Sequence, residues 1–176
     1  YVTIDGRAGG TGNISSLSIL NDSAGNAVDF YDASDNSIIY TSLSSSASVS
    51  GNVIFFYSQA NGSGCNSNSI KNCKIFSSVV ASTVKPVLFY SLNGTSGGGN
   101  SMDTVVNCEF YNFSQSAISI EDNAAGGWYI SGNSFYKSAS YSFTAFTSII
   151  NIVSLFSQTP HIIENNFFGG TASNCS

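Results

Sequence analysis

The residues best suited to chemistry in this chain are its cysteines, and two of them stand in the same local sequence. Cys73 lies in SIKNCKIF and Cys108 in TVVNCEFY, so each follows an asparagine and comes two residues before a large apolar residue. Two such thiols could pack side by side, form a disulfide, or act in metal binding or catalysis. Their spacing matches no zinc motif and no histidine is near in sequence. We therefore expect buried, reduced thiols, with a disulfide as the alternative.

The other two cysteines, Cys65 and Cys175, stand in polar segments rich in Gly, Asn and Ser. An even number of cysteines in a secreted chain favours bridging, and a Cys65–Cys175 disulfide would tie a long loop to the C-terminal tail. The repeat described below separates the two by about three coils, roughly 14 Å along the axis. This disulfide is a candidate, but not the outcome that the spacing favours.

Carboxylates supply a third set of candidates. Asp29 and Asp32 lie in VDFYDASDN, where an expected strand turns into a loop. Paired carboxylates hydrolyse glycosidic bonds on some β-rich folds. Aspartate is also an ordinary turn residue, and no lysine or arginine is close to Asp32 in sequence. The sequence therefore favours a protein that is not an enzyme, with a polysaccharide lyase or glycoside hydrolase as the alternative.

Tyrosines extend this set. Tyr31, Tyr57 and Tyr90 each follow a phenylalanine that we assign to one inward column, formed by Phe30, Phe56 and Phe89. The tyrosines would then form an outward row beside Asp29 and Asp32. Aromatic faces stack on sugar rings and phenol groups bond hydroxyls, so the row is a candidate carbohydrate-binding surface. It could equally pack under loops or against another protein.

Composition limits the partners and indicates the fold class. Charged residues make up only 9% of the chain, and the net charge is −5. Five cations without a basic cluster argue against nucleic acid as a partner. No apolar run is long enough for a membrane helix, so we expect no membrane insertion. Short runs of Ile, Val, Phe and Tyr between Gly, Asn and Ser predict an all-β protein. Nothing in the sequence calls for a cofactor or a metal.

A repeat positions the candidates. The hexad Ile70–Ile75 recurs as Ile38–Leu43, Val105–Phe110, Ile130–Phe135 and Ile163–Phe168, and less cleanly as Ile14–Ile19. Strict alternation would turn Lys74 or Glu109 inward at great cost, so the chain must bend inside the hexad. The first, fourth and sixth residues then face inward. The fourth-position column reads Leu17, Thr41, Cys73, Cys108, Asn133 and Asn166. Such a column predicts one parallel β-solenoid domain of about six coils over residues 1–176.

These hexads carry a resemblance. The pattern I-x-x-N-x-I resembles the right-handed parallel β-helix repeats of pectate-lyase-like proteins, in which inward asparagines form a hydrogen-bonded ladder. VTIDGRAGGTG, with SLSILND, NSIIYTSL and NSIKNCKIF, resembles the β-helix domains of large secreted surface proteins of Bacteroidetes, many of them similar to type IX secretion substrates and adhesins. The resemblance implies a secreted or cell-surface location. Thr41, Cys73 and Cys108 depart from an all-asparagine ladder.

The same resemblance bears on glycosylation. DSA and DTV resemble the bacterial O-glycosylation motif, which makes Ser23 and Thr104 candidates. In a eukaryotic secreted chain the N-x-S/T sequons, among them those at Asn61 and Asn93, would be the relevant sites instead.

The expected function is structural. Each terminal coil of a solenoid exposes strand edges, and this sequence contains no recognisable polar cap. We therefore expect a rigid extracellular module of an adhesin-like or matrix protein that contacts other copies of itself, or flanking domains, through its ends. The alternative is a carbohydrate-binding or carbohydrate-cleaving β-helix protein with glycans as partners.

Overall fold

The computed structural model contains almost only short strands. It describes residues 1–46, 51–78, 85–93, 98–122, 125–138, 148–153 and 159–175. The elements are β1 (Thr3–Asp5), η1 (Ala8–Gly10), β2 (Leu17–Asn21), β3 (Val28–Tyr31), β4 (Ser37–Ile39), β5 (Thr41–Ser45), β6 (Ile54–Ser58), β7 (Ser69–Lys71), β8 (Lys74–Ser77), β9 (Val87–Asn93), β10 (Thr104–Val106), β11 (Glu109–Tyr111), β12 (Ser116–Glu121), β13 (Tyr129–Ser131), β14 (Ser134–Tyr136), β15 (Ile150–Val153), β16 (Ile162–Glu164), β17 (Phe167–Phe168) and η2 (Ser173–Cys175). Neither of these two short helices is long or apolar enough to cross a membrane.

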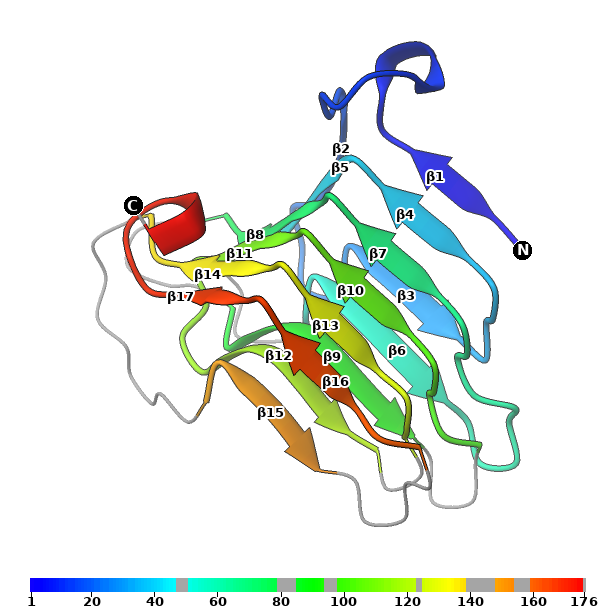
Figure 1. Ribbon diagram of the computed structural model, residues 1–176. Coiled ribbons are helices and arrows are strands. Elements are labelled where there is room, and N and C mark those ends of the chain that lie inside the picture. The colour runs from blue at the N-terminus through cyan, green and yellow to red at the C-terminus, as the bar shows by residue number, and fades with distance from the viewer. Residues whose placement is uncertain are drawn as a thin grey trace.

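The strands form three parallel sheets (Figure 1). In each sheet, a strand pairs with the strand that comes three later in chain order, as β1 does with β4. The first sheet has the order β1-β4-β7-β10-β13-β16, the second β2-β5-β8-β11-β14-β17, and the third β3-β6-β9-β12-β15. The predicted fold class, an all-β parallel β-helix, is confirmed. The described strands make five complete coils and two strands of a sixth, slightly fewer than the six coils expected.

The chain bends between the first and second sheets at the third residue of each hexad. The bend residues all have a positive φ: Tyr40 (51°), Asn72 (56°), Asn107 (54°), Gly132 (68°) and Asn165 (56°). Asparagine and glycine tolerate this left-handed conformation better than other residues. The bend inferred from the charges is therefore present. It also explains the Asn-Cys pairs, because the asparagine makes the turn and the cysteine after it points inward.

The first coil differs from its expected hexad. β1 pairs with β4 so that Ile4 lies beside Ile38, and β2 pairs with β5 so that Leu17 lies beside Thr41. Ile14 is in no strand and is 74% exposed, so its assignment as a first-position residue is wrong. Gly6 lies beside Tyr40 at the bend, and residues 7–16 are an insertion between Gly6 and Leu17 that interrupts the repeat of the first coil.

The core lies inside the three sheets. First-position residues such as Ile70 and sixth-position residues such as Phe110 are completely buried. Phe56 is in register with Phe30, but Phe89 pairs with Ile54 two residues earlier, so the expected phenylalanine column is shifted at β9. The rings of Phe56 and Phe89 still lie 5.0 Å apart. On the outer face, the same shift places Tyr90 beside Phe55 and not beside Tyr57.

Candidate functional site

The inward column at the bend, which we call the bend column, is held by side-chain hydrogen bonds between coils. Asn133 Oδ1 accepts the N–H of Cys108 at 2.9 Å, and Asn133 Nδ2 donates to the Val105 carbonyl at 2.9 Å. Asn166 repeats both bonds one coil on, to Asn133 and Ile130. Each asparagine therefore satisfies two backbone groups of the coil before it.

Cys73 and Cys108 occupy the same column as free, buried thiols. Their sulfur atoms lie 3.5 Å from the carbonyl oxygens of Ile38 and Ile70, the positions that the asparagine amides bond in later coils. Both thiols are free in the structure, which contradicts the disulfide alternative. Burial raises the pKa of Cys108 well above its usual range. Among the described residues no three His, Cys, Asp or Glu side chains gather where a metal could bind.

Cys65 is also a free thiol and is completely buried, so the proposed Cys65–Cys175 disulfide is wrong. Its sulfur lies 3.3 Å from the Phe30 carbonyl, and its N–H donates to Asn100 Oδ1 at 2.8 Å. The polar sequence around Cys65 suggested a surface loop, but this residue turns into the core. The side chain of Cys175 lies outside the described part of the chain.

A second inward column, which we call the turn column, precedes the first sheet and was missed by the sequence analysis. Asn68 Oδ1 accepts the N–H of Asn36 at 3.0 Å, and Asp103 Oδ1 accepts the N–H of Asn68 at 2.7 Å. Asp103 is 1% exposed, and its Oδ2 has no hydrogen-bond partner among the described residues. Burial raises the pKa of Asp103 to about 8, so the carboxyl is largely neutral at pH 7.

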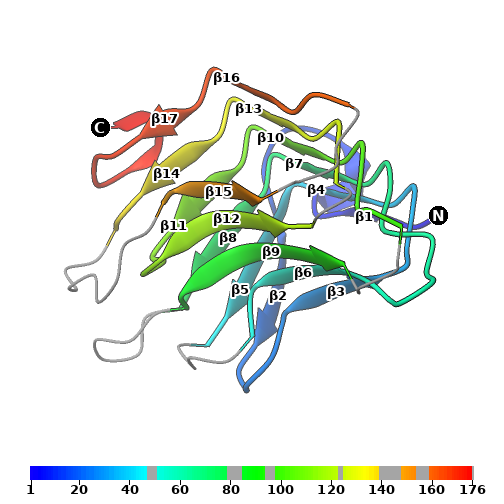
Figure 2. The same cartoon turned by 90° about the horizontal axis from the view of Figure 1, so that it is seen from below.

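The third sheet, which carries Tyr31, Tyr57 and Tyr90, faces the viewer in Figure 2. The three tyrosines do not form one straight row. Tyr31 is in register with Tyr57, and their rings lie 5.1 Å apart. Tyr90 is in register with Phe55, so the expected row Tyr31–Tyr57–Tyr90 is corrected by the shift at β9. Phe55 completes the contact, since its ring lies 5.7 Å from Tyr57 and 5.8 Å from Tyr90. The result is a diagonal aromatic path.

The two predicted carboxylates, Asp29 and Asp32, have different hydrogen-bond partners. Asp29 is exposed on the outer face of β3, where Asn26 Nδ2 donates to it at 2.6 Å. Asp32 follows that strand and accepts hydrogen bonds from Ser58 Oγ at 3.1 Å and the Gly64 N–H at 3.2 Å. Asp32 thus fixes the loop after β6, and its oxygens are engaged there. Of these two carboxylates, Asp29 is the one that remains available to a ligand on the aromatic path.

The candidate glycosylation sites differ in exposure. Ser23 lies in an exposed turn, and Asn61 is exposed with a positive φ of 64°. Asn93 ends β9 and is half-buried. Thr104 begins β10, within the first sheet, directly after the buried Asp103. Ser23 and Asn61 are therefore the more accessible of the four, and modification at any of them stays a prediction.

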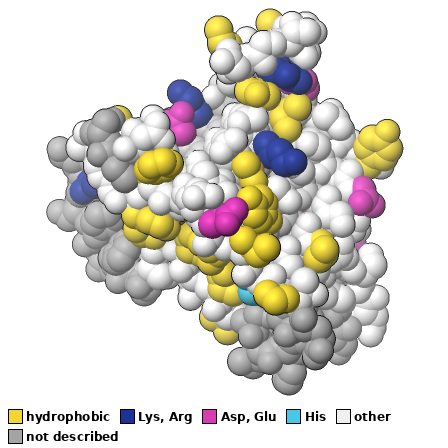
Figure 3. Space-filling model, viewed as in Figure 1, with side chains coloured by type: hydrophobic (Ala, Val, Ile, Leu, Met, Phe, Trp, Pro, Cys, Tyr) yellow, Lys and Arg dark blue, Asp and Glu magenta, His cyan; other side chains and the backbone are white. Residues whose placement is uncertain are grey.

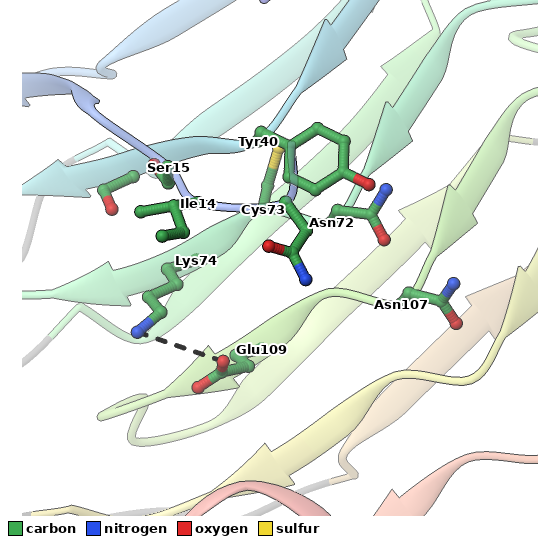
Figure 4. A pocket seen from close by; sticks show the side chains of 10 residues that line it. Ile14, Ser15, Tyr40, Asn72, Cys73, Lys74, Asn107 and Glu109 are labelled. Atoms are coloured by element: carbon green, nitrogen blue, oxygen red, sulfur yellow. Dashed lines mark ion pairs between the residues drawn. The ribbon is translucent and has the colours of Figure 1, made fainter. Parts of the chain in front are cut away.

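A polar hollow at the bend was not anticipated from the sequence. Figure 4 shows Asn72 and Asn107 on successive coils, with Lys74 and Glu109 on the strands that follow the bend. The insertion of the first coil lines one end of this hollow through Ile14 and Ser15, and the volume of the hollow is about 510 Å³. The signal available in the sequence was the pair of bend asparagines, which we had considered only together with the inward cysteines.

Comparison with models of known protein families, with curated proteins and with solved structures finds no match.

Proposed function

We propose that this chain is a rigid structural or adhesive module of an extracellular protein, secreted or displayed at a cell surface, and that further solenoid coils stack on its ends. The uncovered core at the last coil is the observation that supports this proposal. Ile163 and Phe168 are 46% and 50% exposed, although Ile130 and Phe135, one coil earlier in the same columns, are 0% and 1% exposed.

A further coil would complete what the interior coils already have. The N–H and C=O groups on the free side of β16 and β17 are suited to parallel strand addition. Ile163 and Phe168 would be buried by the added strands, which favours association. The resemblance of the hexads to surface-protein β-helix domains adds support for an extracellular location. In this proposal the added coil belongs to a second copy of this chain.

The test measures self-association. In sedimentation and light scattering, we expect the chain to associate as its concentration rises, and electron microscopy should then show rods or filaments. Ile163→Lys with Phe168→Lys should abolish association, because lysine at the joint would bury an unpaired charge. Met102→Lys is the matched control, since Met102 is 56% exposed away from the end coils. A chain that stays monomeric at every concentration, or a double variant that associates as before, would contradict the proposal.

A second candidate function is carbohydrate binding at the aromatic path of Tyr31, Tyr57, Phe55 and Tyr90. The specific observation is the continuous set of ring contacts beside the exposed Asp29. The fold itself is compatible with a structural or an enzymatic role. Loss of polysaccharide binding in Tyr57→Ala would support this candidate, and loss of polysaccharide cleavage in Asp29→Asn would add an enzymatic activity. A chain that neither binds nor cleaves polysaccharides would exclude it.

A further inference from the structure

A groove runs along the bend on the outside of the solenoid, and we call it the bend groove. It consists of two hollows of about 510 and 440 Å³ that share Asn107 and Glu109. The insertion of the first coil lines one end through Asn13, Ile14 and Ser15. The C-terminal tail lines the other end through Ser173 and Asn174. Two chain segments that lie outside the coil repeat thus limit the groove at both ends.

The groove offers free amides at a regular spacing. Asn72 and Asn107 occupy equivalent positions in successive coils, one strand spacing or about 4.8 Å apart. Their φ values of 56° and 54° fix both backbones in the same conformation. Figure 4 shows the two side chains pointing in the same direction. Within the described residues neither side-chain amide makes a hydrogen bond, so both have donors and acceptors for a ligand.

The charges in the groove balance each other. Lys74 Nζ lies 4.0 Å from Glu109 Oε1, and the two side chains are 51% and 29% exposed. This separation makes a weak surface ion pair whose atoms can still bond a polar ligand. Figure 3 shows few charged side chains on this face of the molecule. An acidic ligand would therefore find no net positive charge in the groove, which favours a neutral one.

An aromatic column borders the groove. On the outer face of the second sheet, two residues beyond Lys74 and Glu109, the rings of Phe76 and Tyr111 stack at 4.6 Å and 6°. Tyr136 continues the stack at 5.0 Å from Tyr111, and its hydroxyl donates to Glu109 Oε2 at 2.7 Å. Half-buried rings beside hydrogen-bonding groups are typical of sites that bind sugars.

We propose that the bend groove binds a neutral oligosaccharide that lies along the solenoid axis. The amides of Asn72 and Asn107 bond hydroxyls of successive sugar units, and Glu109 and Lys74 accept from and donate to hydroxyls on the other wall. The stacked rings of Tyr111 and Tyr136 present an apolar edge to the sugar faces. This site is separate from both the solenoid ends and the aromatic path on the third sheet.

The test uses calorimetry with neutral hexasaccharides of glucose, xylose or mannose, and with a hexagalacturonate as the acidic probe. At least one neutral probe should bind, and hexagalacturonate should bind at least tenfold more weakly. Asn72→Gly with Asn107→Gly should weaken binding at least tenfold, because glycine keeps the positive φ but removes the amides. Asn61→Gly, at another exposed residue with a positive φ, should leave the affinity unchanged.

Three results would overturn the proposal: no binding of any neutral probe at millimolar concentration, tighter binding of hexagalacturonate, or an unchanged affinity in the double glycine variant. Circular dichroism of the double variant identifies loss of fold. If the double variant is unfolded, Lys74→Ala with Glu109→Ala replaces it, because both side chains are partly exposed and neither position has a positive φ. The replacement pair should weaken binding to the same extent, and an unchanged affinity would overturn the proposal.

Discussion

The bend column and the turn column both supply hydrogen bonds to buried backbone groups, but they continue through different numbers of coils. Both place polar side chains inside the solenoid, one per coil, where they bond backbone groups of the preceding coil. The bend column continues to Asn166, in the last coil. The turn column ends at Asp103, because the equivalent position one coil later is Trp128, which has no acceptor to offer.

This difference shows what an inward ladder needs. An asparagine can accept from one backbone N–H and donate to one backbone carbonyl, so Asn133 satisfies two groups at once. A thiol is a weaker donor than an amide, and Cys73 and Cys108 each donate to a carbonyl of the preceding coil. A carboxyl has no N–H donor, and in the described part of the chain one buried oxygen of Asp103 has no partner. The side chain tolerated at each coil therefore depends on the groups that the neighbouring coils leave unsatisfied.

The largest effect is expected from the bend column. Asn133→Ala would leave the N–H of Cys108 and the carbonyl of Val105 buried without partners, and would open a cavity. We expect the free energy of unfolding to fall by about 3 kcal/mol. Urea denaturation measures this, with Asn165→Gly as the control, because Asn165 is exposed and its positive φ suits glycine. A loss below about 1 kcal/mol in Asn133→Ala would show that the ladder is not a main source of stability.

A smaller effect, dependent on pH, is expected from the turn column. The folded-state pKa of Asp103 is raised to about 8, whereas the unfolded value is near ~4. The folded state therefore binds the extra proton between these values, so the stabilising contribution of protonated Asp103 is present below about pH 4 and is lost as pH rises through about 8.

Asp103→Asn should remove this pH dependence, because the amide does not ionise. At pH 9 the variant should be more stable than the parent chain by about 2 kcal/mol, and at pH 5 the two should be similar. Thermal unfolding at both pH values tests this. Equal pH profiles for the two chains would mean that Asp103 is ionised at neutral pH and has a partner in solution.

The smallest effect is expected from the cysteines. Cys108→Ala removes one thiol from a close-packed column and should destabilise the fold by about 1 kcal/mol, less than Asn133→Ala. Cys65, Cys73 and Cys108 should all resist Ellman's reagent in the folded chain and react once it unfolds. Rapid labelling of Cys73 in the native state would show that the bend column opens locally.

The sequence predicted the parts of the fold that repeat at a constant spacing. The hexads located the bend because Lys74 and Glu109 must point outward. This requirement can be recognised within a single hexad, without knowledge of how the coils pair. The turn column escaped notice because Asn36, Asn68 and Asp103 become equivalent only when the pairing of β4, β7 and β10 is known. The inserted segment and the shift at β9 were missed for the same reason, since coil pairing and not local pattern fixes them.

The candidate site was predicted less well than the fold. Tyr31 and Tyr57 were correctly expected to be neighbours, but Phe55 was not recognised as the link to Tyr90. Asp32 was considered for its carboxylate chemistry, although its partners Ser58 and Gly64 lie on another coil. Side chains that meet on the surface of this molecule come from neighbouring coils. Which of them meet depends on the lengths of the loops between the strands, and these lengths do not follow the repeat.

The parallel pairing of the coils also determines how the molecule carries force. Hydrogen bonds between coils run along the axis, so tension applied along the axis loads every bond between two neighbouring coils together. β9 and β12 are paired over five residue pairs, whereas β13 and β16 share three pairs and β14 and β17 share two. Under tension along the axis, the joint before β16 is therefore expected to open first, while the interior coils remain closed.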